Sequence, residues 1–459
     1  MWMSLLTLLV AHAAEPSWVT RFVFPHAAGP PADRCPPPVV VPPAPRAARP
    51  EVEDIRTRGM VRIDLAPGAA NAEIPADLRA HALAPADPTA LPAVPVEGAP
   101  DVVRRIREVL ARAATRPVRV AMWGDSLTAA DRLPSALRRA LQATYGDAGR
   151  GFVLPAAPWP AWNPVDLERC STGVWRPESE RTATARKDGL YGPGGVSLEA
   201  SEAEATSWMQ TPAGLSVSRF EVAYLAQPGG GRLRAQVDSE PPLMVATAAD
   251  TVGPGLLRLD VPDGRHRLTL TVVGDGPVRI FGVTLDRDTP GVTLDGMGVG
   301  GSTAGDWAKW SEPLMAPFLA RRPPELVLLE YGTNDSAANK MTPDRYRAEL
   351  RAQLETMRRQ LPDAACVLVT PADRGQKVIG TTYAVWSPLD WVIRIQEEEA
   401  PAFGCATWSM RRAMGGEGAA FAWRLAQPPL MGADLLHPTP AGYEELGRRL
   451  AAALMAAGG

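Results

Sequence analysis

The segment 118–127, VRVAMWGDSL, joins an apolar run to a small turn and then to a helical pattern. Its first six residues, 118–123, have the length and composition of a buried β-strand. Gly124 follows at once, and three leucines then recur every fourth residue within 130–144, which is the spacing of one helix face. We therefore predict a β-strand, a tight turn that exposes Ser126, and a helix that packs against the strand.

The same alternation of strand and helix patterns returns in the C-terminal part of the chain. Strands are predicted at 292–297, 326–331, 365–370 and 404–410, and helices at 306–319, 343–360, 388–399 and 440–456. Such alternation is typical of a parallel sheet covered by helices on both faces. We predict an α/β fold with a doubly wound, parallel, five-stranded sheet, whose site lies at the carboxyl ends of the strands.

Between these two α/β parts, residues 170–288 follow a different pattern. Short alternating runs such as SRFEVAYLA and HRLTLTVV are separated by glycine and proline, which predicts strands joined by turns. We predict an inserted all-β sandwich at 170–288 that divides the α/β domain into 99–169 and 289–459. A helix beginning near Asp101 is expected to lead into the first strand.

The N-terminal region carries two further expectations. Residues 1–14 have a short apolar stretch followed by Ala-His-Ala, which predicts a signal peptide and export to the periplasm or the cell exterior. The absence of Lys and Arg from this stretch leaves a misassigned start as the alternative. Residues 15–98 are rich in proline and alanine, and we predict that they form a spacer.

Four cysteines, Cys35, Cys170, Cys366 and Cys405, are compatible with an oxidising compartment and allow three pairings. Cys366 and Cys405 each begin a predicted strand, so we favour that pair, with buried free thiols as the alternative.

Composition excludes several classes of partner. The formal net charge is −3 and no long run of Lys or Arg occurs, so nucleic acid is not expected as a partner. Beyond the N-terminus no apolar stretch is long enough to predict a membrane span. No metal-ligand motif or phosphate-binding loop occurs, and no cofactor or metal is expected.

One motif imitates a nucleotide site. Residues 296–301, GMGVGG, match G-x-G-x-x-G after a predicted strand. A dinucleotide loop belongs in the first βαβ unit with an acid ending the next strand, and Glu330 is the only candidate acid here. We instead expect these glycines to let the backbone approach a reacting group.

Three residues suit nucleophilic catalysis. Ser126 follows the first strand, and Asp434 and His437 lie three residues apart before the last helix. A serine hydroxyl needs a histidine base, and an acid must fix the tautomer of that histidine. Alone, Ser126 would be a helix cap and His437 a surface residue, but together they predict a Ser-His-Asp triad.

An ester attacked by Ser126 passes through an oxyanion that needs preorganised donors. We predict that the backbone N–H groups of Ser126 and Gly301 and the side chain of Asn334 supply them. Taken alone, Asn334 could instead close an Asx-turn, and Asp335 could cap the next turn.

These blocks, WGDSL, GVGGST, YGTND and DLLHP, resemble in order the four blocks of the SGNH or GDSL hydrolases. The resemblance covers about 240 residues outside the insert. It implies Ser126 as nucleophile, Gly301 and Asn334 as oxyanion donors, and His437 with Asp434 as the base and its partner. Ser302 stands where many members carry Asp or Ala, so Gly300 remains the alternative to Gly301.

The first block followed by a β insert resembles the exported peptidoglycan O-acetylesterases of this superfamily. That resemblance implies a serine esterase that removes O-acetyl groups from a cell-wall polysaccharide. An O-acetyltransferase with the same triad and a glycan-binding protein with a vestigial core are the alternatives. We assign Asp125, Trp159 and Trp162 to substrate binding, and the sequence does not predict an oligomeric state.

Overall fold

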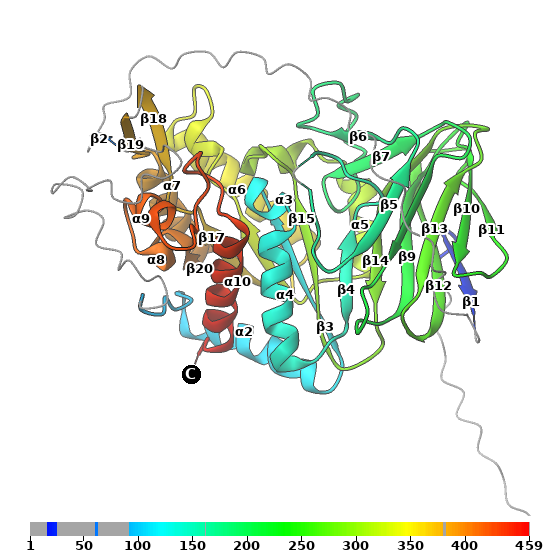
Figure 1. The fold of residues 1–459 in the computed structure, drawn as a ribbon, viewed down its shortest axis with the longest axis horizontal. Coiled ribbons are helices and arrows are strands. Elements are labelled where there is room, and N and C mark those ends of the chain that lie inside the picture. Colours follow the sequence, from blue (N-terminus) through cyan, green and yellow to red (C-terminus); the bar gives the residue numbers. More distant parts are fainter. Residues whose placement is uncertain (1–15, 25–59, 63–90, 161, 380–381, 459) are drawn as a thin grey trace, which may run out of the picture.

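The computed structural model describes residues 16–24, 60–62, 91–160, 162–379 and 382–458 of the 459-residue chain. An α/β domain and a β-sandwich lie side by side, on the left and the right of Figure 1. The predicted signal peptide, 1–14, lies outside the described residues. Within the described residues, no helix is both long and apolar enough to cross a membrane.

Five parallel strands form the central sheet, which confirms the predicted fold. Their order is β15 (Gly291–Gly298), β3 (Pro117–Gly124), β16 (Leu326–Glu330), β17 (Ala365–Thr370) and β20 (Ala406–Ser409). In chain order, β3 is the first strand of this sheet. The next, β15, pairs with one side of β3 at the edge of the sheet, and the third, β16, pairs with the other side of β3. The strand order therefore reverses around β3, and ligand sites of open α/β sheets lie at such a reversal.

Helices cover both faces of the sheet because its strands alternate apolar side chains between two cores. In β3, Val118, Val120 and Met122 join one core, whereas Ala121 and Trp123 join the other. The helices that contribute to the first core are α2 (Pro100–Ala111), α4 (Arg132–Tyr145), α8 (Met410–Met414), α9 (Ala419–Leu425) and α10 (Pro440–Met455). Those of the second are α5 (Glu312–Arg321), α6 (Pro343–Gln360) and α7 (Leu389–Glu399).

The helix boundaries follow local sequence signals where these are strong. A Thr-Pro pair begins both α6 and α10, and the side chains of Thr342 and Thr439 accept hydrogen bonds from the backbone of the first turn. The helix predicted at 306–319 is instead a 3-10 helix, Ala304–Lys309, followed by α5. Extended backbone at Trp310 and Ser311 divides the two.

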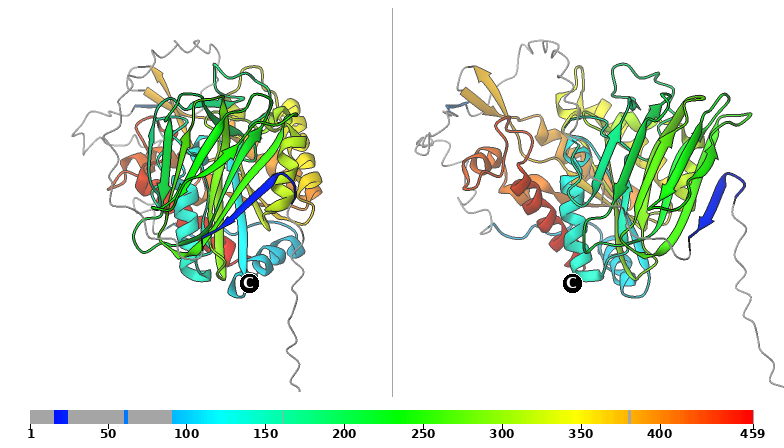
Figure 2. Two further views of the ribbon diagram at one scale, coloured as in Figure 1. Left: turned by 90° about the vertical axis from the view of Figure 1, so that its right-hand side faces the viewer. Right: turned by 45° about the vertical axis from the view of Figure 1, so that its right-hand side comes forward.

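The β-sandwich contains two antiparallel sheets with one parallel edge strand. One sheet has the order β1 (Val19–Val23), β12 (Gly253–Gly264), β9 (Val217–Ala226), β14 (Val278–Asp286), β7 (Val196–Ala200) and β6 (Arg176–Ser179), with β4 (Gly149–Val153) also paired to β14. The other has the order β11 (Leu243–Ala246), β10 (Arg232–Val237), β13 (Arg267–Val272), β8 (Thr206–Gln210) and β5 (Glu168–Thr172). Figure 2 shows these two layers from two further directions.

Two predicted boundaries are wrong. The strand β4 lies in the range assigned to the α/β domain, yet it pairs with β14 of the sandwich, so the insert begins near Gly149 rather than at residue 170. The predicted spacer, 15–98, contains β1, which pairs in parallel with β12, and β2 (Met60–Arg62), which pairs with β19 (Thr382–Val385). Edge pairing adds these short segments to sheets formed by distant residues.

The sandwich shares a core with the α/β domain, because the second core runs from Trp123 of β3 to Phe152, Leu198 and Tyr224 of the sandwich. Arg322, directly after α5, crosses the same boundary and bonds Asp286 at 2.8 Å as well as Asp295 of β15. Although burial opposes ionisation, Arg322 holds the pKa of Asp286 well below its ordinary value. The two parts are therefore held together by apolar contact and by a buried ion network.

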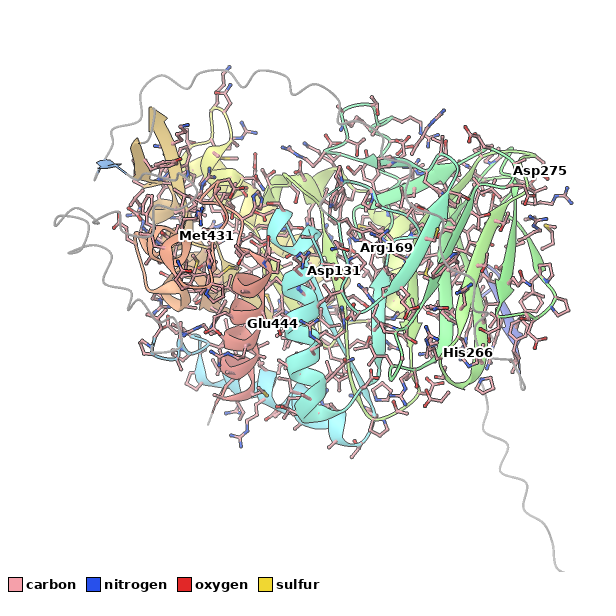
Figure 3. All side chains as sticks on the ribbon, in the orientation of Figure 1. Asp131, Arg169, His266, Asp275, Met431 and Glu444 are labelled. Carbon is pink, nitrogen blue, oxygen red and sulfur yellow. A yellow bond between two sulfur atoms is a disulfide. The ribbon has the colours of Figure 1, made fainter. Side chains whose placement is uncertain are left out.

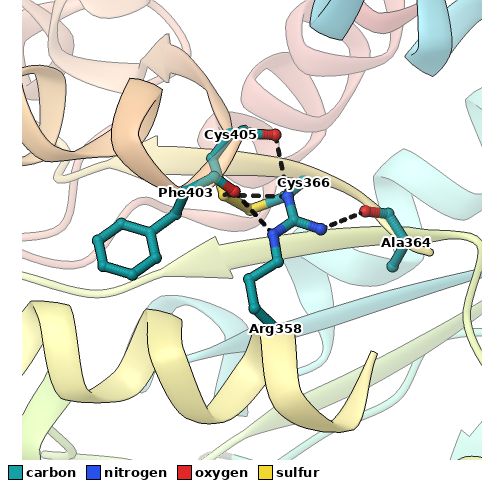
Figure 4. The surroundings of a disulfide bond; sticks show 6 residues. Arg358, Ala364, Cys366, Phe403 and Cys405 are labelled. Carbon is teal, nitrogen blue, oxygen red and sulfur yellow. Dashed lines mark hydrogen bonds between the residues drawn. A yellow bond between two sulfur atoms is a disulfide. The ribbon is translucent and has the colours of Figure 1, made fainter. Parts of the chain in front are cut away.

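The predicted pairing of Cys366 with Cys405 is confirmed, and their disulfide joins the start of β17 to the segment before β20. Arg358 of α6 lies beside it and donates hydrogen bonds to the carbonyl groups of Phe403 and Ala364 (Figure 4). Cys170 is also disulfide-bonded, and Cys35 lies outside the described residues.

Replacing both Cys366 and Cys405 with alanine is expected to lower the free energy of unfolding by about 4 kcal/mol, because the bridge closes a loop between residues separated by 39 positions. Denaturant unfolding of the wild type and the double variant measures this loss. A difference below about 1 kcal/mol would contradict a stabilising role for the disulfide.

Candidate active site

Ser126 lies at the carboxyl edge of the sheet, at the first position of the short helix α3 (Ser126–Ala129). Gly124 ends β3, and the side chain of Asp125 caps α3 by accepting a hydrogen bond from Leu127 N at 3.0 Å. A Cβ on Gly124 would lie 2.2 Å from Thr128 Oγ1 and 2.8 Å from the Glu330 carbonyl oxygen, so only glycine fits between the strand and the helix. The turn therefore presents Ser126 above the sheet, as predicted.

The structure brings the three predicted triad residues together. His437 Nε2 lies 2.9 Å from Ser126 Oγ, and His437 Nδ1 lies 2.7 Å from Asp434 Oδ2. The other carboxylate oxygen, Asp434 Oδ1, accepts hydrogen bonds from the backbone N–H groups of Leu436 and His437. Both oxygens of Asp434 are thus engaged, and the imidazole is held between a hydroxyl and a carboxylate.

The acid of this triad is open to solvent but remains ionised. The side chains of Asp434 and His437 are 52% and 40% exposed. Partial burial raises the pKa of Asp434, but the hydrogen bonds from His437 and the two backbone groups outweigh it and lower the pKa to about 2. Asp434 therefore carries its charge at every pH at which a folded enzyme would normally be assayed.

The structure describes only one other histidine, His266, and it lies in the sandwich. Figure 3 shows it at the far end of the molecule from Met431, which pairs with Pro438 next to His437. His266 Nδ1 bonds the buried Asp238 at 2.7 Å. Among the described histidines, therefore, His437 is the one that can serve Ser126.

The loop after β15 packs against the Ser126 turn. Val299 N donates to the Gly124 carbonyl at 3.0 Å, and Ser302 Oγ bonds the same oxygen at 3.3 Å. A Cβ on Gly298 would lie 2.2 Å from Ala129 N, so only glycine at this position allows the loop to approach α3 so closely. The GMGVGG motif thus supports the serine turn.

The three predicted oxyanion donors lie in or beside this loop. Gly301 is half-buried with a φ of 82°, a conformation that favours glycine. Asn334, after β16, donates through Nδ2 to the Ser302 carbonyl at 3.1 Å, which leaves its second N–H for another acceptor. Ser126 N, at the first position of a helix, has no partner within that helix. The three predicted oxyanion donors therefore lie on adjoining segments.

Asp335 joins the segment after β16 to the loop after β15. Its Oδ1 accepts a hydrogen bond from Ala304 N at 3.1 Å, and the carboxyl group is fully buried. Burial raises the pKa of Asp335 to about 7. The residue therefore anchors the loop after Gly301, in addition to beginning the 3-10 turn Asp335–Ala337.

Replacing Asp335 with asparagine is expected to flatten the pH dependence of stability. Between about pH 4 and pH 7 the unfolded chain loses the Asp335 proton while the folded protein keeps it, so the free energy of unfolding falls by up to about 1.4 kcal/mol per pH unit. The amide oxygen of the variant can still accept from Ala304 N, but the side chain does not ionise. Denaturant unfolding across this range should therefore show a smaller fall in Asp335→Asn, and parallel curves would contradict the assignment. Asp344→Asn, at an exposed position in the first turn of α6, controls for the substitution itself.

Comparison with known proteins identifies related domains and folds. The GDSL-like lipase/acylhydrolase family model matches residues 271–445, the part that holds Gly301, Asn334, Asp434 and His437. Residues 271–445 therefore lie in a GDSL-like hydrolase domain. The solved structure of a peptidoglycan O-acetylesterase matches 80% of this chain and 96% of its own, with a TM-score of 0.63 and 22% identity, and it shares the fold.

Two other solved structures align at lower TM-scores. A family two carbohydrate esterase from Clostridium thermocellum, in complex with cellohexaose, is 14% identical, with a TM-score of 0.26 over 56% of this chain and 93% of its own. The salicylyl-acyltransferase SsfX3 from a tetracycline biosynthetic pathway is 14% identical, with a TM-score of 0.29 over 65% of this chain and 95% of its own. No match was found among curated protein sequences.

The assignment of Asp125 to substrate binding in this hydrolase is wrong. Its side chain is fully buried beneath Ser126 and faces Glu330, the last residue of β16. Glu330 is also fully buried, and its Oε2 accepts from Thr128 Oγ1 at 3.1 Å. Burial raises the pKa of both carboxyls, and the charge of Asp125 raises that of Glu330 further.

Of the two tryptophans assigned to the substrate, only Trp162 lies where the prediction excludes it. Trp162 is only 5% exposed and belongs to the core, with the Arg169 guanidinium 4.3 Å from its ring centre. Trp159 is half-buried and donates to the Ala129 carbonyl at 3.3 Å, so it supports the end of α3. A buried ring cannot stack on a sugar, and for Trp162 the prediction is therefore wrong.

Sequence reasoning missed two residues beside the site of the hydrolase domain. Glu330 was considered only as a nucleotide-binding acid, although a carboxyl that ends an entirely apolar strand could have indicated a role under the serine turn. Arg181 lies in the insert and is brought to the loop that carries Gly301 by tertiary structure alone. No local pattern marks it.

Proposed function

We propose that this protein is a serine esterase that removes O-acetyl groups from a cell-wall polysaccharide, and that this polysaccharide is peptidoglycan. The observation that carries the proposal is the continuous chain of hydrogen bonds from Ser126 Oγ through His437 to Asp434. With base and nucleophile already in contact, the arrangement is equipped for acyl transfer. It also argues against a vestigial core.

In the proposed first step, Ser126 Oγ attacks the acetyl carbonyl carbon and its proton passes to His437 Nε2. The N–H groups of Ser126 and Gly301 and the amide of Asn334 stabilise the oxyanion. When the tetrahedral intermediate collapses, the carbon–oxygen bond to the sugar breaks and His437 returns the proton to the sugar oxygen. An acetyl ester of Ser126 remains.

In the second step, water attacks the acetyl group and gives its proton to His437. Acetate leaves, and Ser126 Oγ recovers the proton. Asp434 stays ionised throughout and stabilises the imidazolium formed in each step. A sugar hydroxyl in place of water would make the same site a transferase, so the acceptor distinguishes the two reactions.

The exposure of the triad supports a large substrate, because a polymer can reach His437 and Asp434 without entering a closed pocket. The likeness of fold to a peptidoglycan O-acetylesterase adds to this support. The Cys366–Cys405 disulfide favours action outside the reducing cytoplasm, and we propose that the protein is exported.

Acetate release from O-acetylated peptidoglycan, acetylated xylan and a small soluble acetyl ester tests the proposal. Release from peptidoglycan in preference to xylan is expected. Cleavage of the small ester alone would leave the esterase chemistry intact and overturn the cell-wall substrate. Acetylated glycan product that forms only when an acceptor polysaccharide is added would indicate transfer.

A further inference from the structure

The loop between β6 and β7 of the sandwich, residues 180–195, reaches into the hydrolase domain. Trp123 of β3 donates through Nε1 to the Pro193 carbonyl at 2.8 Å, and Ser311 N donates to the Gly189 carbonyl at 2.9 Å. Near its start, the Glu180 carboxylate lies 3.2 Å from Lys309 Nζ. These contacts along its length hold the loop in place against the α/β domain.

This loop places Arg181 over the oxyanion segment. Its Nε and Nη2 atoms lie 3.6 and 3.7 Å from the position that a Cβ on Gly301 would occupy. Gly301 is the predicted backbone donor to the oxyanion, on the segment that Asn334 also contacts through Ser302. A guanidinium from the insert therefore borders the place where an acetyl ester must lie.

Among the residues that the structure describes, the charge of Arg181 is only loosely matched. Its Nη1 lies 3.7 Å from Asp306 Oδ2, longer than a hydrogen bond, and the Arg181 side chain is 41% exposed. Asp306 is already engaged by Lys309 Nζ at 3.0 Å and by Thr303 N at 2.9 Å. Arg181 thus keeps donors for a group that arrives from solvent.

We propose that Arg181 is a specificity-determining residue that binds an anionic group of the substrate next to the acetyl ester. The proposal rests on the proposed function and names what the site would recognise. Muramic acid carries a lactyl group that ends in a carboxyl or in an acidic peptide, whereas the xylan backbone is uncharged. A guanidinium matches a carboxylate through two parallel hydrogen bonds, which ammonium does not reproduce.

The test compares kcat/KM on O-acetylated peptidoglycan, neutral acetylated xylan and a small neutral acetyl ester. Arg181→Ala is expected to lower the value for peptidoglycan roughly 10-fold and to leave the small ester unchanged. Arg181→Lys should recover part of the loss, and added salt should reduce the advantage of the wild type. Arg186→Ala is the matched control, because Arg186 lies in the same loop but bonds Glu199 of the sandwich at 2.7 Å.

Two results would overturn the role of Arg181: an unchanged value for peptidoglycan, or an equal fall on all three substrates, which would mean that Arg181 only shapes the oxyanion segment. If the wild type releases no acetate from peptidoglycan, the proposed substrate fails separately. The same comparison on an acetylated polyuronate against xylan then decides the role of Arg181. Preference for the charged polymer that Arg181→Ala abolishes supports the role, and absence of any charge preference overturns it.

Discussion

Replacing Ser126 with alanine is expected to lower kcat on a small acetyl ester by about 10³ to 10⁶. The reason is that Ser126 Oγ is the atom 2.9 Å from His437 Nε2, and no acetyl-enzyme can form without it. Replacing His437 with alanine should cost a similar factor, because the serine then lacks its base. Steady-state kinetics of each purified variant measures the loss.

Two controls keep this result interpretable. Ser171, exposed on β5 of the sandwich, gives a serine-to-alanine variant that should retain full activity. Thermal unfolding of Ser126→Ala should match the wild type within a few degrees, because the half-buried hydroxyl makes no bond except that to His437 within the described residues. A Ser126→Ala variant that keeps more than about a tenth of the wild-type kcat would rule out this residue as the nucleophile.

Replacing Asn334 with alanine is expected to lower kcat by about 10² to 10³ with little change in KM. Its Nδ2 bonds the Ser302 carbonyl, which orients the amide on the segment that carries Gly301. A donor held in this way stabilises the oxyanion of the transition state more than the neutral carbonyl of the bound ester. The effect therefore falls on kcat.

Asn339 provides the comparison for this variant, since it is an exposed asparagine five residues further along the same segment. Asn339→Ala should behave as the wild type. If Asn334→Ala raised KM and left kcat unchanged, Asn334 would bind the ground state of the substrate, and the assignment of the oxyanion donors would be wrong.

The sequence predicted the α/β core well because its signals are local. The strands β3, β16 and β17 are mainly apolar runs of the right length, and Thr342 and Thr439 precede proline at the start of α6 and α10. The site was predictable for a related reason. The carboxyl ends of parallel strands meet at one edge, so residues after β3, β15 and β16 converge wherever they lie in the chain.

What the sequence did not predict depends on contacts between distant residues. The pairing of β4 with β14 and of β1 with β12 has no local pattern, and both shifted the predicted domain boundaries. Asp125 precedes Ser126 and was assigned to substrate binding. Only the tertiary structure shows it fully buried against Glu330.

The central claim is that Ser126 carries the acetyl group between the two steps. Mass spectrometry of the enzyme, quenched in acid during turnover of an acetyl ester and digested, tests this most directly. One acetyl group on the peptide that contains Ser126, absent from Ser126→Ala, is the predicted result. An active enzyme that shows no acetylation, or acetylation of another residue that persists in Ser126→Ala, would contradict the account.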